Sequence, residues 1–246
     1  MAGPDLLVDR AADPLATLLL AHGAGVAMDA PVMAAYASAL AAAGITVLRF
    51  EFAYMAARRS GSRRPPPRAE ALVGEFMGAV AVATPLAEGP LLVGGKSLGG
   101  RVATMVAGGV DMVGDDMGAL DPGEGRLEEP AGGTAPRPVA GALADAIAGV
   151  VVFGYPLHPP GKPEALRLAP LTACRRPLLI LQGERDPFGT PAEFATAGLP
   201  ASVRIVAFAD GDHDLAPRLR SGLTHDGHIR TAATEAAALA RGLRMV

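Results

Sequence analysis

Residues 91–104 read Leu-Leu-Val-Gly-Gly-Lys-Ser-Leu-Gly-Gly-Arg-Val-Ala-Thr, and this stretch decides the fold. A short apolar run stops at two glycines, and a helix-like segment starts at Arg101. Between them, Gly95, Ser97 and Gly99 form the pattern Gly-x-Ser-x-Gly, in which a strand turns sharply into a helix. The small residues let the strand and the helix approach without Cβ clashes. The serine oxygen is then exposed beside the unpaired N–H groups of a helix N-terminus, which is the setting of a nucleophile.

The five-residue pattern is a weak signal when taken alone, because the chain contains 31 glycines. A strand-to-helix turn that needs glycines only for steric reasons would give the same letters. The flanking apolar run and helix favour the catalytic interpretation, and the rest of the chain has to decide between the two.

Short apolar runs alternate with helix-like stretches along the chain. The runs lie at 16–21, 45–50, 91–93, 150–153, 178–181 and 203–208, and the helix-like stretches at 31–43, 68–83, 101–107 and 228–241. Continuous apolar runs bounded by glycine are typical of strands buried on both faces of a parallel sheet. The alternation predicts an α/β fold: a single domain over residues 1–246, with about six mostly parallel strands and helices on both faces.

Two stretches interrupt this pattern. Residues 58–68 hold five arginines and three consecutive prolines, which predicts an extended, stiff loop. Residues 108–140 are rich in glycine, proline and acidic side chains, which predicts a flexible surface insertion.

Composition narrows the function classes. The net charge of -3 argues against nucleic acid as a partner. The N-terminus lacks the features of a signal peptide, and no uninterrupted apolar run is long enough to span a membrane, so no membrane partner is expected. Cys174 is the only cysteine, which suits a reducing cytoplasm. Twenty arginines against two lysines, together with abundant alanine, indicate a GC-rich bacterial genome. Nothing in the sequence specifies an oligomeric state.

A serine hydroxyl is a poor nucleophile unless a base takes its proton, and the base needs an orienting partner. Asp186 follows the run 178–181, and His213 follows the run 203–208. Reacting groups gather beyond the carboxyl ends of parallel strands, so both side chains and Ser97 are expected at one edge of the sheet. We assign Ser97 as nucleophile, His213 as base and Asp186 as the acid that orients it.

The other histidines and aspartates fit these roles less well. His225 and His228 lie at the start of the last helix, where surface or capping roles are expected. His22 is interpreted as a buried hydrogen-bonding residue that shapes the loop after the first strand. Asp210 and Asp212 are too close in sequence to the base to approach its ring from the opposite side.

The oxyanion of the reaction needs two N–H donors. Leu98, directly after the nucleophile, supplies one, and the loop after the first strand supplies the other. Within that loop Ala24 is the first choice, with Gly23 and Gly25 as close alternatives. No His-x-x-x-His pairing is present, so no metal site is predicted, and no cofactor is implied.

These motifs resemble the α/β-hydrolase superfamily, and more narrowly a dienelactone-hydrolase-like group. That group includes the hydrolase-like domain of a subunit of the NSL chromatin-acetylation complex. The resemblance runs from about residue 16 to the end, except for 108–140. Its matching stretches are His-Gly-Ala-Gly (22–25), Arg-Phe-Glu-Phe-Ala-Tyr-Met (49–55), Gly-Gly-Lys-Ser-Leu-Gly-Gly-Arg (94–101), Gly-Tyr-Pro-Leu-His-Pro-Pro-Gly-Lys-Pro (154–163), the Asp186 segment and Asp-Gly-Asp-His (210–213).

The resemblance implies a Ser-Asp-His hydrolase fold but supplies no substrate. The expected partner is a small-molecule ester or thioester. Two alternatives stay open: a catalytically idle interaction module that keeps the fold, and a site that runs other acyl-transfer or lyase chemistry.

The arginines of 58–68 leave the predicted sheet at the same edge as Ser97. Arg58, Arg59 and Arg63 are candidate substrate-binding residues, because guanidinium groups pair with carboxylate and phosphate in a two-pronged geometry. The alternative is a solvated basic loop that pairs with the acidic insertion at 111–129. For Lys96, beside the nucleophile, the sequence leaves open whether it faces the pocket or the helix behind it.

Overall fold

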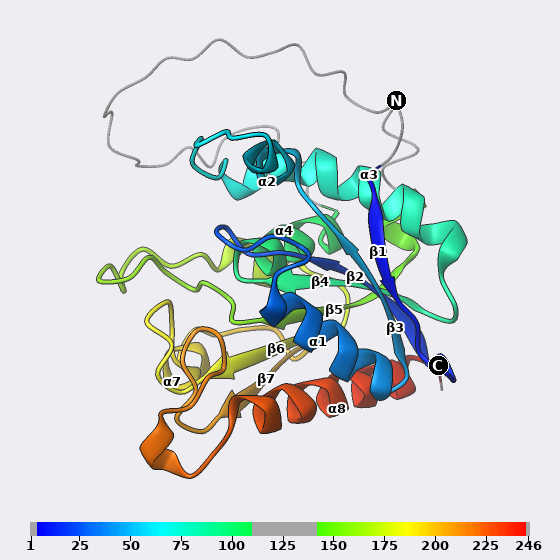
Figure 1. Cartoon of the computed structure of the whole chain (residues 1–246). Helices are drawn as coiled ribbons and strands as arrows, with labels where there is room; N and C mark the ends of the chain where they lie inside the picture. Colours follow the sequence, from blue (N-terminus) through cyan, green and yellow to red (C-terminus); the bar gives the residue numbers. More distant parts are fainter. Residues whose placement is uncertain (1–3, 110–141, 245–246) are drawn as a thin grey trace.

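The computed structural model describes residues 4–109 and 142–244, and in them the chain forms one α/β domain built on a seven-stranded sheet (Figure 1). The strand order is β1-β3-β2-β4-β5-β6-β7; β1 is antiparallel to β3, and the other neighbours are parallel. The strands are β1 (Leu6–Asp9), β2 (Ala16–Ala21), β3 (Ile45–Phe50), β4 (Leu91–Lys96), β5 (Ile147–Phe153), β6 (Leu178–Gly183) and β7 (Val203–Phe208).

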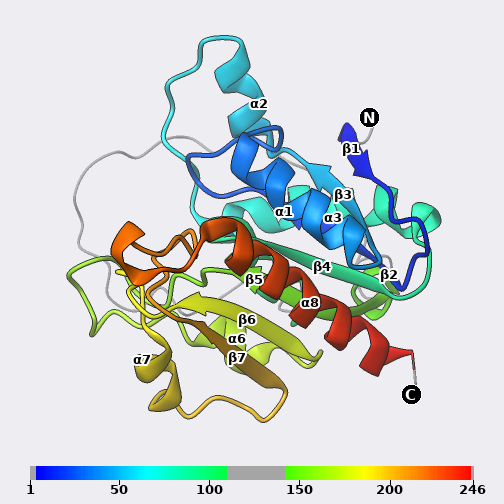
Figure 2. The same ribbon diagram turned by 60° about the horizontal axis from the view of Figure 1, so that its bottom comes forward.

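Helices cover both faces of this sheet. One face is covered by α1 (Pro31–Ala42) and α8 (His225–Leu243), which lie side by side in Figure 2. The other face is covered by α3 (Val73–Ala83), α4 (Leu98–Ala107) and α6 (Ala169–Ala173). The short helix α2 (Ala53–Arg59) follows β3, and α7 (Pro191–Ala195) follows β6. In the described part of the chain, 3-10 turns lie at Ala69–Leu72, Thr84–Leu86 and Leu219–Ser221.

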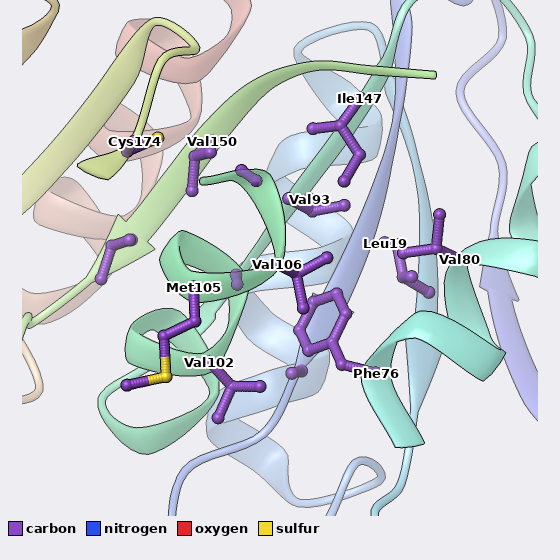
Figure 3. Close-up of a cluster of buried hydrophobic side chains, with 14 of the residues drawn as sticks. Leu19, Phe76, Val80, Val93, Val102, Met105, Val106, Ile147, Val150 and Cys174 are labelled. Atoms are coloured by element: carbon purple, nitrogen blue, oxygen red, sulfur yellow. The ribbon is translucent and has the colours of Figure 1, made fainter. Parts of the chain in front are cut away.

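The sheet separates two apolar clusters, and residues alternate between them along each strand. On β2, Leu19 packs under α3 and α4, whereas Leu18 and Leu20 pack under α1 and α8. This is the two-residue period of a strand, and both faces are buried because each is covered by helices. Figure 3 shows the first cluster, where Phe76 of α3 and Val106 of α4 meet above the sheet.

All six predicted strands are present, and the sheet has one more. The seventh strand, β1, is short, partly exposed and antiparallel at the edge of the sheet; its three apolar residues, 6–8, lie between Asp5 and Asp9, and they were not predicted to form a strand. An ion pair between Asp9 and Arg49, with Oδ2 and Nε 2.9 Å apart, joins it to β3.

The prediction of an extended loop over 58–68 is wrong at its start. Arg58 and Arg59 form the last turn of α2, and the chain leaves regular structure only after them. Alanine and methionine dominate residues 53–57, and their helix propensity extends the helix up to the arginines. The predicted insertion at 108–140 lies outside the described residues, apart from the two glycines that end α4.

One stretch of the described chain, Ala69–Leu86, is long and apolar enough to cross a membrane by length and composition, with a mean hydropathy of 1.3. A single such stretch is weak evidence, since a packed core helix gives the same values. Here Phe76, Ala79 and Val80 of this stretch are buried in the cluster beneath α3.

Candidate active site

Ser97 sits on the turn between β4 and α4 in a strained conformation. Its φ of 51° and ψ of -112° place a non-glycine residue in a region that L-residues rarely adopt. The turn is tight: a Cβ on Gly95 or on Gly99 would lie 2.8 Å from the carbonyl oxygen of Ala21. The N–H of Ser97 donates to the carbonyl of Phe153 at the end of β5, at 3.0 Å. The glycines of the motif are therefore required by close backbone packing at this edge of the sheet.

His213 and Asp186 are brought together by the loops after β7 and β6. Nδ1 of His213 lies 2.8 Å from Oδ2 of Asp186, and the carboxylate is fully buried. An ionised carboxylate only accepts hydrogen bonds, so Nδ1 carries the proton and Nε2 is left as the basic nitrogen.

His213 also lies against the strand end that holds Ser97. A Cβ on Gly154 would be 3.1 Å from His213 Nδ1, and Gly154 directly follows Phe153, the residue bonded to the Ser97 N–H. Thus β4, β5 and the β7 loop converge on one point. Among the described residues, no hydrogen bond joins the Ser97 hydroxyl to the His213 ring; such contacts are often long before substrate binds.

Asp186 is held by two further donors that the sequence analysis did not identify as functional. The side-chain amide of Gln182 donates to Oδ2 of Asp186 at 2.7 Å, and the N–H of Phe188 donates to Oδ1 at 2.8 Å. Gln182 is completely buried on β6, where a long polar side chain directly after the apolar run 178–181 was the available signal. The ring of Phe188 packs 4.3 Å from that of His213, centroid to centroid.

The loop after β2 is shaped by His22, as predicted. Nδ1 of His22 donates to the carbonyl of Gly23 at 2.7 Å, and Nε2 accepts the N–H of Phe52 at 3.1 Å. The ring is therefore neutral, in agreement with its pKa, which burial lowers below the ordinary value although the Gly23 carbonyl opposes this. The hydroxyl of Tyr54 donates to the carbonyls of Gly23 and Ala24 at 3.4 and 3.2 Å.

These contacts orient the peptide between Gly23 and Ala24. In a trans peptide the C=O and the N–H point in opposite directions. Since the Gly23 carbonyl faces the His22 ring and Tyr54, the N–H of Ala24 faces away from them. The loop also lies beside the nucleophile: a Cβ on Gly23 would be 3.8 Å from Cβ of Ser97. On the other side, Leu98 is the first residue of α4, so its N–H has no partner within the helix.

The remaining histidines and aspartates have other partners. His225 and His228 lie in the first turn of α8. Their rings contact the carbonyls of Asp214 and Leu215, respectively. Asp210 pairs with Arg185 and Arg218. Asp212 accepts two backbone N–H groups, those of Asp214 and Ala216.

The three candidate substrate-binding arginines differ in their surroundings. Arg59 forms ion pairs with Asp29 and Glu51, each at 2.8 Å, so its guanidinium is shared between two carboxylates. Arg58 lies over the ring of Tyr54, 5.6 Å from its centroid, and donates to the carbonyl of Arg64. Arg63 is exposed. The acidic insertion, the alternative partner of these arginines, lies outside the described residues.

Lys96 faces the loop that carries His213. Its ammonium lies 2.6 Å from Oδ1 of Asp214, and its side chain is buried, although it directly precedes the nucleophile.

Within residues 4–109 and 142–244, no group of three or more His, Cys, Asp or Glu side chains is placed to hold a metal ion. The arrangement offers a partly buried serine, a base with an orienting carboxylate, and N–H groups from two sides.

Comparisons with known proteins agree with this architecture. No curated protein matches the sequence. Among solved structures, a dienelactone hydrolase from Anabaena variabilis is 18% identical and superposes with a TM-score of 0.62 over 94% of this chain and 88% of that one. An alpha-beta serine hydrolase homologue from Coxiella burnetii is 16% identical, with a TM-score of 0.62 over 96% and 94%. The esterase domain of a Rhodothermus marinus protein is 17% identical, with a TM-score of 0.60 over 96% and 92%.

At these identities the structural likeness shows the fold alone. The family is shown by the sequence, which matches the family described as an alpha/beta hydrolase domain over residues 14–120 and 131–241, most of the chain. The narrower resemblance to the NSL complex subunit stays a prediction. The strained serine turn, the seven-stranded sheet and this match lead to one statement: the chain belongs to the alpha/beta hydrolase family.

Proposed function

We propose that the protein is a serine hydrolase that cleaves an ester or thioester of a small molecule. The observation that carries the proposal is the convergence of the strained Ser97 turn and the buried Asp186–His213 hydrogen bond at one edge of the sheet. Membership of the alpha/beta hydrolase family supports it.

In the proposed mechanism, Oγ of Ser97 attacks the substrate carbonyl carbon while Nε2 of His213 accepts the hydroxyl proton. The C–O or C–S bond to the leaving group then breaks, and His213 returns the proton to the departing oxygen or sulfur. A water molecule attacks the acyl-serine, again giving its proton to His213. As that intermediate collapses, the bond between the acyl carbon and Oγ breaks, His213 returns its proton to Oγ of Ser97, and the carboxylic acid leaves. Asp186 stabilises the imidazolium in both steps.

The negative charge on the carbonyl oxygen is held, in this proposal, by the N–H groups of Leu98 and Ala24. Two observations support these donors: Leu98 begins α4, and the Gly23 carbonyl turns away from the Ala24 N–H into its contacts with His22 and Tyr54. Losing one such donor costs about 2.7–4 kcal/mol of transition-state stabilisation in a well-studied protease.

Kinetics of variants test the proposal. With p-nitrophenyl acetate or an acyl thioester, Ser97→Ala and His213→Ala should each lower kcat by roughly 10⁴ to 10⁶, as triad removal does elsewhere. His225→Ala is a control for loss of a nearby histidine, because its ring contacts the Asp214 carbonyl and is assigned no proton transfer, and its effect should be mild. Activity of Ser97→Ala within about tenfold of wild type contradicts the mechanism. Absence of any turnover favours the idle interaction module.

We further propose that the natural substrate carries a carboxylate or phosphate, bound by Arg58 and Arg63. Arg58 supports this because it lies over Tyr54, whose hydroxyl contacts the proposed oxyanion loop. Arg59 is left out of the proposal, since Asp29 and Glu51 already occupy its guanidinium.

A further inference from the structure

Lys96 combines three properties that the proposed mechanism leaves unused. It directly precedes Ser97, its side chain is only 6% exposed, and its ammonium lies 2.6 Å from the Asp214 carboxylate. A buried ammonium is costly unless it is paired, so Lys96 requires the Asp214 carboxylate, which is itself half exposed. Asp214, in turn, directly follows His213.

Asp214 is fixed by its backbone as well as by Lys96. Its carbonyl accepts the hydroxyl of Tyr36 from α1 and Nε2 of His225 from α8, both at 2.8 Å. Its N–H donates to Oδ1 of Asp212 at 2.9 Å. The residue after the base is therefore tied to both helices on one face of the sheet, and through Lys96 to β4.

The charges around Asp214 are coupled to those of the base. Partial burial would raise the pKa of the Asp214 carboxyl, but the bond from Lys96 and the positive charge of Lys96 outweigh it, so that pKa is lowered. The carboxylate is thus ionised beside His213, with its charge balanced by Lys96.

The other groups that face His213 come from three segments. The Asp186 carboxylate and the Phe188 ring come from the loop after β6, and the backbone of Gly154 comes from the end of β5. Asp212 and Asp214 flank His213 in its own loop. Lys96 is the cation paired with one of these carboxylates.

We propose that Lys96 and Asp214 are positioning residues, which lock the loop of the base to the turn of the nucleophile and balance the charge next to the imidazole. This inference rests on the proposed hydrolase function. It predicts that either partner, removed alone, leaves an uncompensated charge of known sign beside His213.

The experiment measures kcat/KM against pH for p-nitrophenyl acetate with wild type, Lys96→Met, Asp214→Asn and the double variant. Lys96→Met leaves the Asp214 anion, which favours the imidazolium form of His213. The fall in kcat/KM on the acid side of the pH profile should therefore move to higher pH. Asp214→Asn leaves the Lys96 cation, which disfavours the imidazolium, so this fall should move to lower pH. We expect the two single variants to shift the acid side of the pH profile by roughly half a pH unit or more in opposite directions. In the double variant the acid side should lie near its wild-type position.

A merely structural pair would lower activity without moving the two pH profiles in opposite directions, and that result overturns the inference. Thermal unfolding shows which variants are folded. If Lys96→Met does not fold, Asp214→Asn decides, because its side chain is half exposed. If Ser97→Ala loses activity but the pH profiles of Lys96→Met and Asp214→Asn do not shift, only the positioning role is refuted. Retained activity in Ser97→Ala refutes the proposed function itself.

Discussion

The backbone of Gly154 lies directly against His213: a Cβ on Gly154 would be 2.6 Å from the His213 carbonyl oxygen and 3.1 Å from Nδ1. Gly154 has a φ of +66°, a conformation that also favours glycine. Two separate constraints, one steric and one conformational, therefore act at the residue that follows β5.

Gly154→Ala should displace His213 and lower kcat/KM by at least tenfold in folded protein, because the added methyl overlaps the histidine. The matched control is Gly161→Ala, which has a similar φ of +73° but open space around its Cβ. Both variants carry a backbone strain of roughly 1–2 kcal/mol, and only the first perturbs the base. Kinetics and thermal unfolding of both measure this. Equal activity losses in the two variants would show that strain alone explains the effect.

Gln182→Met should lower kcat about tenfold with little change in KM, because Asp186 loses the amide that fixes its Oδ2. The same change leaves the N–H of Tyr155 without its acceptor, Oε1 of Gln182, at a cost of about 1–3 kcal/mol of stability. Steady-state kinetics below the unfolding transition separate the two effects. Unchanged kcat in a folded variant would contradict a positioning role for Gln182.

Arg58→Ala/Arg63→Ala should reduce kcat/KM for an anionic ester roughly ten- to a hundred-fold and spare its neutral isostere, since a charge-assisted contact contributes about 1.5–3 kcal/mol. Arg241→Ala is the control, because Arg241 lies in the last turn of α8, at the far end of that helix from the site. Comparable losses on both esters, or none on either, would leave these arginines with a structural or solubilising role.

His22 should make stability depend on pH. Its pKa in the folded chain is lowered by burial, so below the unfolded value of about 6.5 the unfolded chain binds a proton that the folded chain does not. Stability should therefore fall as the pH drops from about 7 toward 5. His22→Gln, which keeps an acceptor for the Phe52 N–H, should show a flatter dependence of Tm on pH than wild type. An equally steep fall in His22→Gln would refute this assignment.

The buried part of the fold was predictable from sequence, because strands covered on both faces need continuous apolar runs. The runs at 16–21 and 45–50 coincide with β2 and β3, in which every residue is buried. The edge strand β1 was not predicted, because its three apolar residues, 6–8, are flanked by Asp5 and Asp9 and none of the four strand residues is fully buried. The helical start of 58–68 was not predicted, because the prediction was based on the arginines and prolines of this stretch and not on the helix-forming alanines at 53–57.

Within the site, the sequence placed Ser97, Asp186 and His213 at one edge of the sheet, since each follows a parallel strand. Contacts between segments that are distant in the chain could not be predicted from the sequence. Lys96 with Asp214, and Arg59 with Asp29, are pairs that depend on how loops from different strands meet. Gln182 likewise becomes meaningful only once the loop after β6 turns back toward its own strand.

Labelling with a fluorophosphonate probe tests the central claim most directly, because the probe reacts covalently only with an activated serine. The folded protein should acquire one adduct, located at Ser97 by peptide mass spectrometry. Ser97→Ala and heat-unfolded wild type should acquire none, and His213→Ala should react far more slowly. Folded wild type that stays unlabelled, or carries the adduct on another serine, would contradict the assignment of Ser97 as the nucleophile.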